Sequence, residues 1–461
     1  MSSLAEASLA RLGNIAGSAA VLTDAALLAA YDVDGARPGA AVRACDAAAA
    51  AEIVRFAGAE NLALIACGGR TKLGIGGAPY RYDLALDLSR MNRILAYDPG
   101  DLTLGVEPGV TLAELRRALA EHGQFLPLES PYAASATVGG TIAANAISPL
   151  RQAFGGPRDF VLGMEFVTGA GESAKGGGRV VKNVTGYDLH KLMIGSLGTL
   201  GVLTRINFRT FPLPAEERAV LAAFSSAENA FSFCAAITRS PLEPRRLETF
   251  DAAAMRLLDL APTGPGSRES AWCVLVDAAG TSAVVTRHQR DLERLACAAD
   301  TAQFTTLESS DRGKWLARAL EFPRYAAERS PEAVLVRIAA PPTAMPALAA
   351  ESLRIARSNP VEPALFLPAM GLAYLALQPR ESGSAALGSL ATAVTQFFEA
   401  ISGNAVNARD ISAMVEGCPA ELKRRISLWG PAKDDFELMQ RVKKVFDPRN
   451  VLSPGRFCGG I

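Results

Sequence analysis

Glycine-rich segments are the part of this sequence whose residue types and spacing could bind a charged ligand. One lies at Cys67–Gly77 (CGGRTKLGIGG), and the stretch Pro131–Phe211 holds further ones between apolar runs. Glycine has no Cβ, so the backbone N–H groups of such turns can approach a ligand closely. Successive N–H groups in turns also form concavities that bind anions such as phosphate. We therefore expect these segments to surround a large cofactor that carries phosphate.

The predicted elements around the first loop set it apart from two common phosphate sites. A helix is predicted over 46–60, with Asp46 as its N-cap, and the apolar strand LALIACGG then runs into the loop. The loop matches neither a P-loop nor a GxGxxG motif that opens a helix. The following residues, YDLALDLSRMNRILAYDPGDLTLGVEPGV, predict strand, turn and strand, which argues against a Rossmann unit. An ordinary glycine-rich hairpin connection stays open as the alternative.

The clearest helix is predicted over 111–123. Thr111 and Glu114 form a capping box, and Gly123 suits the position after the helix end. Residues 1–36 are alanine-rich and predicted to be helical. The last helix is expected to stop at Asp447–Pro448.

Composition excludes several classes of protein. The chain has 461 residues, 49% of them hydrophobic, and a formal net charge of +0, so we expect two to four domains and no nucleic-acid surface. Its seven cysteines include no CxxC pair, so neither an iron–sulfur cluster nor a structural zinc site is expected. With no signal peptide and no membrane span predicted, we expect a cytoplasmic protein. Attachment to a membrane through a partner stays open.

Six motifs, taken in their order and spacing, carry a resemblance to a known family. The sequence resembles the FAD-linked oxidases of the vanillyl-alcohol-oxidase/PCMH type in CGGRTKLG, VEPGVTLAEL, SATVGGTIAANA, FGGPRDFVLG, KNVTGYDLHKLMIGSLGTLGVLT and VFDPRNVLSPGRF. Within that family it looks most like the FAD-binding subunit of glycolate oxidase, the E subunit. The match is dense over about 38–214, returns at about 440–457 and is weak between.

The resemblance implies an α+β fold with a PCMH-type FAD-binding domain. Two α+β subdomains would enclose the FAD, and a separate α+β cap domain would cover the isoalloxazine. Carried over to this chain, the parts would be an N-terminal helical segment (1–36), the FAD-binding domain (37–214), the cap or substrate domain (215–430) and a C-terminal segment that packs back on the FAD domain (431–461).

The resemblance also implies which residues hold the cofactor. One group would wrap the diphosphate with backbone donors: Gly68, Gly69, Arg70, Thr71, Lys72 and Leu73. A second would line the opposite side: Ser135, Thr137, Val138, Gly139, Gly140 and Asn145. A third would lie near the cofactor: Gly186, Tyr187, Gly201 and Val202. For Gly139–Gly140 a turn that requires positive φ is compatible with this role. Because the first loop lacks the histidine that often attaches flavin in this superfamily, we expect noncovalent FAD.

The sequence departs from single-chain 2-hydroxy acid dehydrogenases of this kind in its catalytic residues. Those proteins carry a histidine-rich, metal-binding cap motif, whereas the corresponding stretch here reads LPAMGLAYLALQP. The three histidines, His122, His190 and His288, have no ligand spacing, so we expect no metal, and the catalytic base is unknown. Arg324 and Arg337 are candidates for clamping a substrate carboxylate or contacting a partner, with surface salt bridges as the alternative.

Three functions stay open. The first is the FAD-binding subunit of a glycolate or D-2-hydroxyacid dehydrogenase (oxidase) complex, an FAD-dependent oxidoreductase acting on CH–OH groups. It would accept a hydride on FAD and work with a catalytic FAD subunit and an iron–sulfur subunit that carries electrons onward. The second is a flavin-binding electron-transfer or scaffold subunit without turnover of its own. The third is an autonomous FAD oxidase of another small alcohol or sugar acid.

Overall fold

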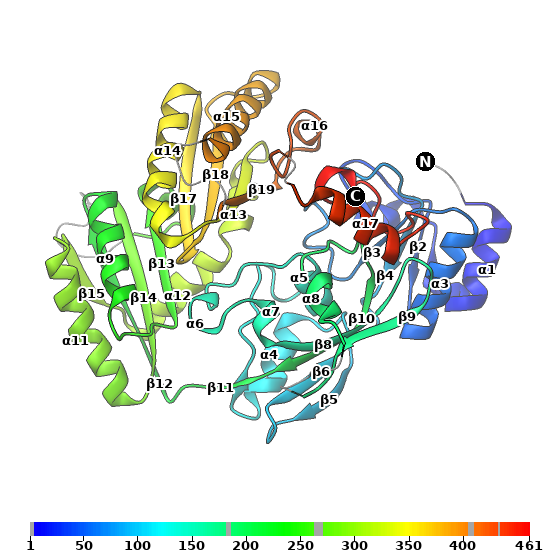
Figure 1. The fold of residues 1–461 in the computed structure, drawn as a ribbon, viewed down its shortest axis with the longest axis horizontal. Helices are drawn as coiled ribbons and strands as arrows, with labels where there is room; N and C mark the ends of the chain where they lie inside the picture. The colour runs from blue at the N-terminus through cyan, green and yellow to red at the C-terminus, as the bar shows by residue number, and fades with distance from the viewer. Residues whose placement is uncertain (1–3, 181–185, 262–270, 404–409, 432–433) are drawn as a thin grey trace. The chain divides into compact units, whose positions relative to one another are not determined.

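The chain divides into two compact units. The computed structural model describes residues 4–180, 186–261, 271–403, 410–431 and 434–461. The first unit comprises Met1–Ala146, Gly156–Leu213 and Ala432–Ile461, and the second comprises Ile147–Gly155 and Pro214–Pro431. Figure 1 shows the helices and strands of each unit. The short segment that carries α6 is thus separated in sequence from the rest of the second unit.

The first unit begins with a four-stranded sheet in the order β1-β2-β4-β3. Strands β2 and β3 both run parallel to β4, and α3 connects them. The predicted cap of α3 is confirmed, because Asp46 Oδ1 accepts the Ala49 N–H at 2.8 Å. The N-terminal residues are largely helical and also supply β1. The elements are α1 (Glu6–Ala16), η1 (Ser18–Ala20), β1 (Val21–Leu22), α2 (Ala25–Leu28), η2 (Ala29–Tyr31), β2 (Ala40–Arg43), α3 (Ala47–Ala59), β3 (Leu64–Cys67) and β4 (Leu84–Asp87).

A five-stranded antiparallel sheet, β5-β6-β10-β8-β9, forms the other half of this unit. The capping box of α4 is confirmed, since the Thr111 side chain accepts the Glu114 N–H at 3.2 Å and Glu114 accepts the Thr111 N–H at 3.1 Å. The elements are β5 (Ile94–Asp98), β6 (Thr103–Val106), α4 (Leu112–Ala120), β7 (Gln124–Phe125), α5 (Val138–Ala143), α7 (Pro157–Phe160), β8 (Val161–Val167), β9 (Ser173–Gly177), α8 (Leu189–Met193), β10 (Val202–Arg209), β11 (Phe211–Pro212), α17 (Phe436–Phe446) and η6 (Cys458–Gly460).

The first glycine-rich loop joins β3 to β4 without a helix. Residues 68–83 are all described and contain turns and bends only. The chain then forms β4, β5 and β6, which confirms the predicted succession of strands after the loop. The loop therefore opens no Rossmann helix, and any ligand must be held by loop backbone and by neighbouring segments.

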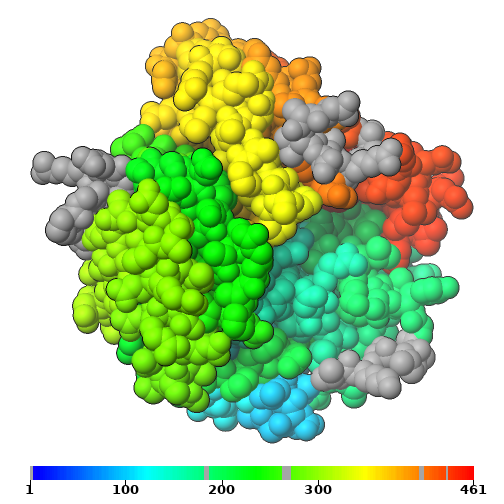
Figure 2. Space-filling model, turned by 60° about the vertical axis from the view of Figure 1, so that its left-hand side comes forward, coloured from blue at the N-terminus to red at the C-terminus, as the bar shows by residue number. Residues whose placement is uncertain are grey.

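The second unit is built on an eight-stranded antiparallel sheet in the order β15-β12-β14-β13-β17-β18-β16-β19. Alternate residues of each strand enter two different cores, as a pleated sheet requires. Helices α9, α11, α14 and α15 contribute to one core, and α10, α12 and α13 to the other. Figure 2 shows the surface of this unit in green to orange.

The stretch LPAMGLAYLAL forms the antiparallel β17–β18 hairpin, in which Gly371 has a φ of 83°. The elements of this unit are α6 (Arg151–Phe154), β12 (Glu216–Phe224), α9 (Ala227–Arg239), β13 (Arg246–Asp251), α10 (Ala252–Leu257), β14 (Trp272–Gly280), α11 (Ser282–Ala298), β15 (Gln303–Thr306), α12 (Ser309–Leu320), α13 (Phe322–Arg329), β16 (Val334–Ala339), η4 (Pro342–Ala344), α14 (Met345–Ser358), β17 (Val361–Ala369), β18 (Leu372–Pro379), α15 (Ser384–Ser402), β19 (Ser412–Gly417) and α16 (Ala420–Lys423).

The C-terminal residues return to the first sheet. Helix α17 ends before Asp447, as the Asp–Pro pair predicts. Residues after it then add to β3, because the Leu64 N–H donates to Val451 O and the Ser453 N–H donates to Leu64 O, both at 2.8 Å. Figure 1 shows this red segment beside β3. The free edge of β3, the strand that leads into the first glycine-rich loop, is thereby covered.

Candidate cofactor site

A cleft in the first unit is bordered by three glycine-rich segments. Its empty space, with the open mouth and the solvent there included, is about 820 Å³. The predicted residues that line it are Gly68, Gly69, Arg70, Thr71, Lys72, Leu73, Thr137, Gly139, Gly140, Gly201 and Val202. The structure thus brings together segments from the β3–β4 loop, from α5 and from the start of β10.

Backbone contact between the first two segments explains their glycines. A Cβ on Gly69 would lie 1.7 Å from Ser135 O, and one on Gly68 would lie 2.3 Å from Thr137 Oγ1. A Cβ on Gly139 would lie 2.6 Å from Pro108 Cβ. The positive-φ turn that the sequence left open as an alternative at Gly139–Gly140 is not formed, because both residues belong to α5 and neither has positive φ. Close packing, rather than left-handed backbone, excludes side chains here.

The charge of the lining suits a polyanion. Arg70, Lys72 and Arg456 border the cleft, and its described lining contains no carboxylate. Gly140 and Gly198 also border it, and the space around a Cβ built on either is nearly empty, with one atom each within 4 Å. Cations and open backbone in the lining fit a ligand that carries a diphosphate.

A buried carboxylate behind the first loop holds Arg70 in place. Asp87 is fully buried, and its Oδ2 accepts from Tyr31 Oη at 2.6 Å and from the Arg70 guanidinium at 3.2 Å. The guanidinium also lies over the Tyr31 ring, 4.9 Å from its centroid. Burial, with the hydrogen bond to Asp87, raises the pKa of Tyr31 to about 12, so the phenol stays protonated and donates. Burial likewise raises the pKa of Cys67, so this lining thiol is no thiolate nucleophile.

Five predicted residues do not line the cleft among the residues described. Ser135 contributes its carbonyl to the contact with Gly69, and Val138 points into the core. Asn145, with a φ of 45°, packs beside Gly195. Gly186 and Tyr187 are exposed, Tyr187 at 88%. The preceding residues 182–185 of the quoted motif lie outside the described part of the chain.

Sequence reasoning missed several residues that shape the cleft. Leu197, Gly198 and Arg456 line it, and Asp87 and Lys443 support its walls from behind. Asp87 ends a fully buried strand, and Arg456 lies in a tail that otherwise reads as turn and apolar residues. A charge in such a place is a usable signal, because buried charges need partners.

The two candidate arginines of the second unit have different environments. Arg324 is engaged on its own helix, with Glu321 at 2.7 Å and Glu328 at 3.2 Å. Arg337 lies on β16, 3.4 Å from Glu416 Oε2, with its side chain 18% exposed. Glu416 also hydrogen-bonds Tyr374, and burial with the nearby Glu416 charge raises the Tyr374 pKa. Only Arg337 belongs to a largely buried polar group.

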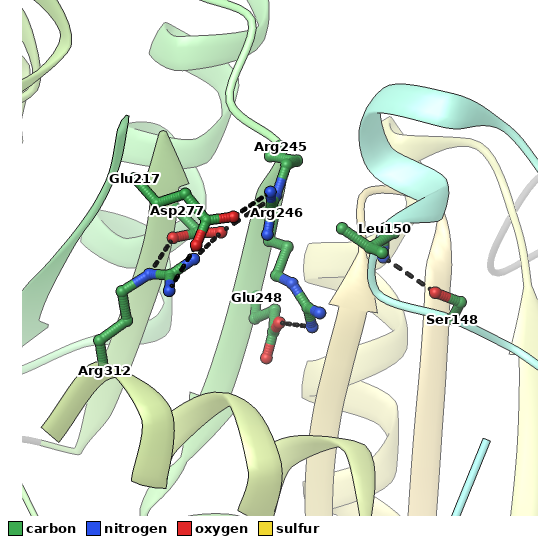
Figure 3. A network of polar contacts seen from close by, with 8 residues as sticks. All are labelled: Ser148, Leu150, Glu217, Arg245, Arg246, Glu248, Asp277 and Arg312. Atoms are coloured by element: carbon green, nitrogen blue, oxygen red, sulfur yellow. Dashed lines mark hydrogen bonds and ion pairs between the residues drawn. The ribbon is translucent and has the colours of Figure 1, made fainter. Parts of the chain in front are cut away.

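A second polar network of this unit is internally paired (Figure 3). Asp277, fully buried, accepts two hydrogen bonds from Arg312 at 2.7 and 3.1 Å and lies 3.4 Å from Arg245. Glu217 contacts both of these arginines. Beside them, Arg246 and Glu248 pair at 3.3 Å, and in Figure 3 they lie near the turn in which the Leu150 N–H donates to Ser148. Three arginines thus meet three carboxylates, which marks the network as structural.

The histidines lie apart from the cleft lining. His122 contacts the Tyr97 ring edge-on, and His288 Nδ1 lies 2.9 Å from Val284 O. His190 is buried in α8, and burial lowers its pKa. Among the described residues no group of three or more potential metal ligands gathers. Likewise, the part of the chain that the structure covers contains no helix with the length and apolarity of a membrane span.

Comparison with known proteins identifies the family. The FAD binding domain model matches residues 38–176, and the model of the FAD linked oxidases' C-terminal domain matches 213–370 and 429–457. Together they match more than half of the chain.

Curated relatives differ in how much of their length the chain spans. The glycolate oxidase subunit GlcD of Bacillus subtilis is 26% identical over 88% of this chain and 85% of that protein. GlcE of Escherichia coli is 45% identical over 28% of this chain, and a D-2-hydroxyglutarate dehydrogenase of Xanthomonas citri is 35% identical over 45%. The chain spans only 37% and 43% of those two proteins.

Solved structures share the fold. A substrate-bound p-cresol methylhydroxylase superposes with a TM-score of 0.78 at 17% identity, covering 98% of this chain and 96% of that one. A 4-ethylphenol oxidase from Gulosibacter chungangensis gives 0.77 at 17% identity, with coverage of 99% and 98%. The implied α+β, PCMH-type fold is thereby confirmed. This chain belongs to the FAD-linked oxidases and is an FAD-dependent oxidoreductase.

Proposed function

We propose that this chain is the FAD-binding subunit of a dehydrogenase complex that oxidises a small 2-hydroxy acid such as glycolate. The names of the relatives support the substrate class, since they are glycolate oxidase subunits and D-2-hydroxyglutarate dehydrogenases. The partners we propose are a catalytic FAD subunit and an iron–sulfur subunit, in the cytoplasm, with any membrane attachment provided by those partners.

Noncovalent FAD is part of the proposal. The lining of the first loop, from Gly68 to Leu73, would hold the diphosphate, with Thr137, Gly139 and Gly140 on the opposite wall. Gly201 and Val202 would hydrogen-bond the cofactor through their backbone. Ser135, Val138 and Asn145 would belong to that opposite side, and Gly186 and Tyr187 would lie near the cofactor. When bound, FAD accepts a hydride from the carbon that bears the hydroxyl group. No histidine or tyrosine among the described lining residues offers the usual attachment point.

The side chains of the lining residues that the structure describes support the subunit role, because they include no base. Oxidising a hydroxy acid also requires that the hydroxyl proton go to a base. The described lining has neither carboxylate nor imidazole, and Cys67 is held protonated. The stretch that would carry the histidine motif forms the buried strands β17 and β18. We propose that a partner subunit supplies the complete acid–base apparatus.

Arg337 is the better candidate for the substrate carboxylate. Its side chain is partly exposed and lies 3.4 Å from Glu416, whereas Arg324 pairs with Glu321 and Glu328, three and four residues away along the chain. A planar guanidinium binds a carboxylate through two parallel hydrogen bonds, which an ammonium cannot reproduce. Arg337→Lys should therefore raise KM for the hydroxy acid about tenfold or more, and Arg324→Lys should leave it unchanged.

The decisive test is anaerobic reduction of the bound flavin. Glycolate or D-lactate is added to the purified chain alone and to the complex purified with co-expressed partners, and the visible flavin absorbance is followed. Bleaching in the complex but not in the chain alone supports the subunit role. Bleaching in the chain alone favours an autonomous oxidase. No bleaching in either sample, despite bound FAD, contradicts the 2-hydroxy acid assignment and favours an electron-transfer or scaffold role.

A further inference from the structure

We propose that residues 443–456, here called the C-terminal clip, set the shape of the FAD cleft, with Arg456 and Lys443 as positioning residues. The clip lies more than 200 residues from the segments that it contacts, and each contact is within the first unit. The inference rests on FAD binding and not on the identity of the substrate.

Arg456 fixes the first glycine-rich loop from behind. Its guanidinium is buried, at 4% exposure, and donates to Gly77 O at 2.6 Å and also to Leu73 O and Ile75 O. A carboxylate, Asp34, lies 3.4 Å away. Arginine keeps its charge in proteins, so its buried donors must all find acceptors. Three carbonyls of one loop and the Asp34 carboxylate accept hydrogen bonds from it, which fixes the path of the loop that borders the cleft.

The two backbones are also in direct contact at this point. The Gly77 N–H donates to Arg456 O at 3.0 Å, and a Cβ on Gly76 would lie 2.3 Å from the same oxygen. The loop and the residue that braces it therefore form one packed unit. Arg456 borders the cleft itself, so its positive charge faces the space in which a diphosphate would lie.

Lys443 fixes another wall of the cleft, the one formed by the third glycine-rich segment. Its ammonium is buried at 7% exposure and donates to Thr199 O at 2.9 Å, Leu452 O at 2.8 Å and Asp447 Oδ2 at 2.6 Å. These three acceptors use all three of its N–H donors. Thr199 immediately precedes the segment that contains the lining residues Gly201 and Val202. Lys443 thus connects α17 to the third glycine-rich segment.

The backbone of the clip connects the contacts of Arg456 with those of Lys443. Asp447 accepts the N–H groups of Val451 and Leu452 at 2.9 and 2.7 Å, and the same residues add to the edge of β3. Strand β3 leads into the first loop, and Thr199 leads into β10. One short segment therefore sets the distance between two walls of the cleft. A ligand that contacts both walls should bind more weakly when either cation is removed.

Affinity for FAD, measured on the full-length protein freed of flavin, tests this inference. We expect Arg456→Gln to raise the FAD Kd at least tenfold, with a smaller rise for Arg456→Lys, which keeps a charge but loses the planar fork. Lys443→Met should also raise Kd. Arg449→Gln is the matched control, because this exposed guanidinium of the same segment donates to Gly58 O at 3.0 Å, away from the cleft lining. Its Kd should match that of the wild type.

Melting of the flavin-free proteins separates positioning from general destabilisation. The proposal requires Arg456→Gln and Lys443→Met to lose affinity even at temperatures where both remain folded, and to change the visible spectrum of flavin at saturation. Kd values and spectra equal to those of Arg449→Gln would overturn it. Should Arg456→Gln not fold, Arg456→Lys and Lys443→Met decide by the same criterion. A wild-type protein that binds no FAD would instead remove the cofactor assignment itself.

Discussion

The two units use buried charge in different ways. In the first unit the buried cations Lys443 and Arg456 donate chiefly to backbone carbonyls of loops that border a cleft. In the second unit Asp277 and Arg312 satisfy one another inside a sheet-and-helix core. A buried cation that hydrogen-bonds loop carbonyls can hold two walls of a cleft apart and leave room for a ligand. A buried ion pair whose members contact one another fills the interior and leaves no such room. The comparison therefore separates a binding unit from an internally paired one.

The largest effect should follow from breaking the paired network. Asp277→Ala leaves two arginines beside a vacated buried position, which should lower the free energy of unfolding by about 3–5 kcal/mol. FAD affinity of the folded protein should not change. Chemical denaturation and FAD titration measure the two quantities. Asp291→Ala, which removes ion pairs to exposed arginines, is the control and should leave the free energy of unfolding nearly unchanged. Lost FAD affinity in folded Asp277→Ala would erase the distinction between the units.

A methyl group added to the first glycine-rich loop should lower FAD affinity, which Asp277→Ala should leave unchanged. Gly69→Ala places a Cβ 1.7 Å from Ser135 O, and overpacking of this kind costs roughly 2–3 kcal/mol, or about 100-fold in FAD affinity if the cleft absorbs it. Gly74→Ala is the matched control, since no atom lies within 4 Å of its Cβ. Titration of the flavin-free proteins gives both Kd values. Equal affinities would show that contact between the two glycine segments does not shape the site.

The buried carboxylate of Asp251, in the second unit, should make the free energy of unfolding depend on pH. Burial raises the pKa of Asp251 to about 7, so the folded protein holds a proton that the unfolded chain releases. The resulting stability is full below the ordinary pKa of 3.8 and is lost as pH rises through about 7. Asp251→Asn does not titrate, so it should gain roughly 2 kcal/mol relative to wild type between about pH 5 and pH 8.

Denaturation of both proteins at the two pH values checks this expectation. Asn also places an N–H near the Leu365 N–H, which Asp251 accepts at 3.0 Å, so the variant carries a constant cost at every pH. The change with pH is therefore the informative quantity. A difference that does not move with pH would mean that Asp251 is ionised in the folded protein.

The smallest effect is expected at Arg324. Its partners lie three and four residues away on α13, and such pairs contribute about 0.3–0.5 kcal/mol each. Arg324→Gln should thus lower the unfolding free energy by less than ~1 kcal/mol and leave flavin reduction by the complex unchanged. A slowed reduction would give Arg324 a role in substrate or partner binding and would count against Arg337 as the better candidate.

Local signals predicted local structure well. The cap at Asp46 and the box at Thr111 and Glu114 depend on residues a few positions apart, so the sequence alone could place them. For the glycine pair 139–140 the sequence could not decide between helix and positive-φ turn, because both can require a missing side chain. Arg456 and Gly77 are 379 residues apart, and no local pattern encodes that contact. The motifs therefore located two walls of the cleft but not what fixes their distance.

The flavin content of the purified full-length protein tests the central claim most directly. We expect a yellow protein, or a colourless one that takes up FAD to about one equivalent per chain, and we expect acid precipitation to release that flavin into solution. A folded protein that stays colourless and takes up no FAD would contradict the claim that three glycine-rich segments hold this cofactor. Flavin that remains with the precipitate would contradict noncovalent binding alone.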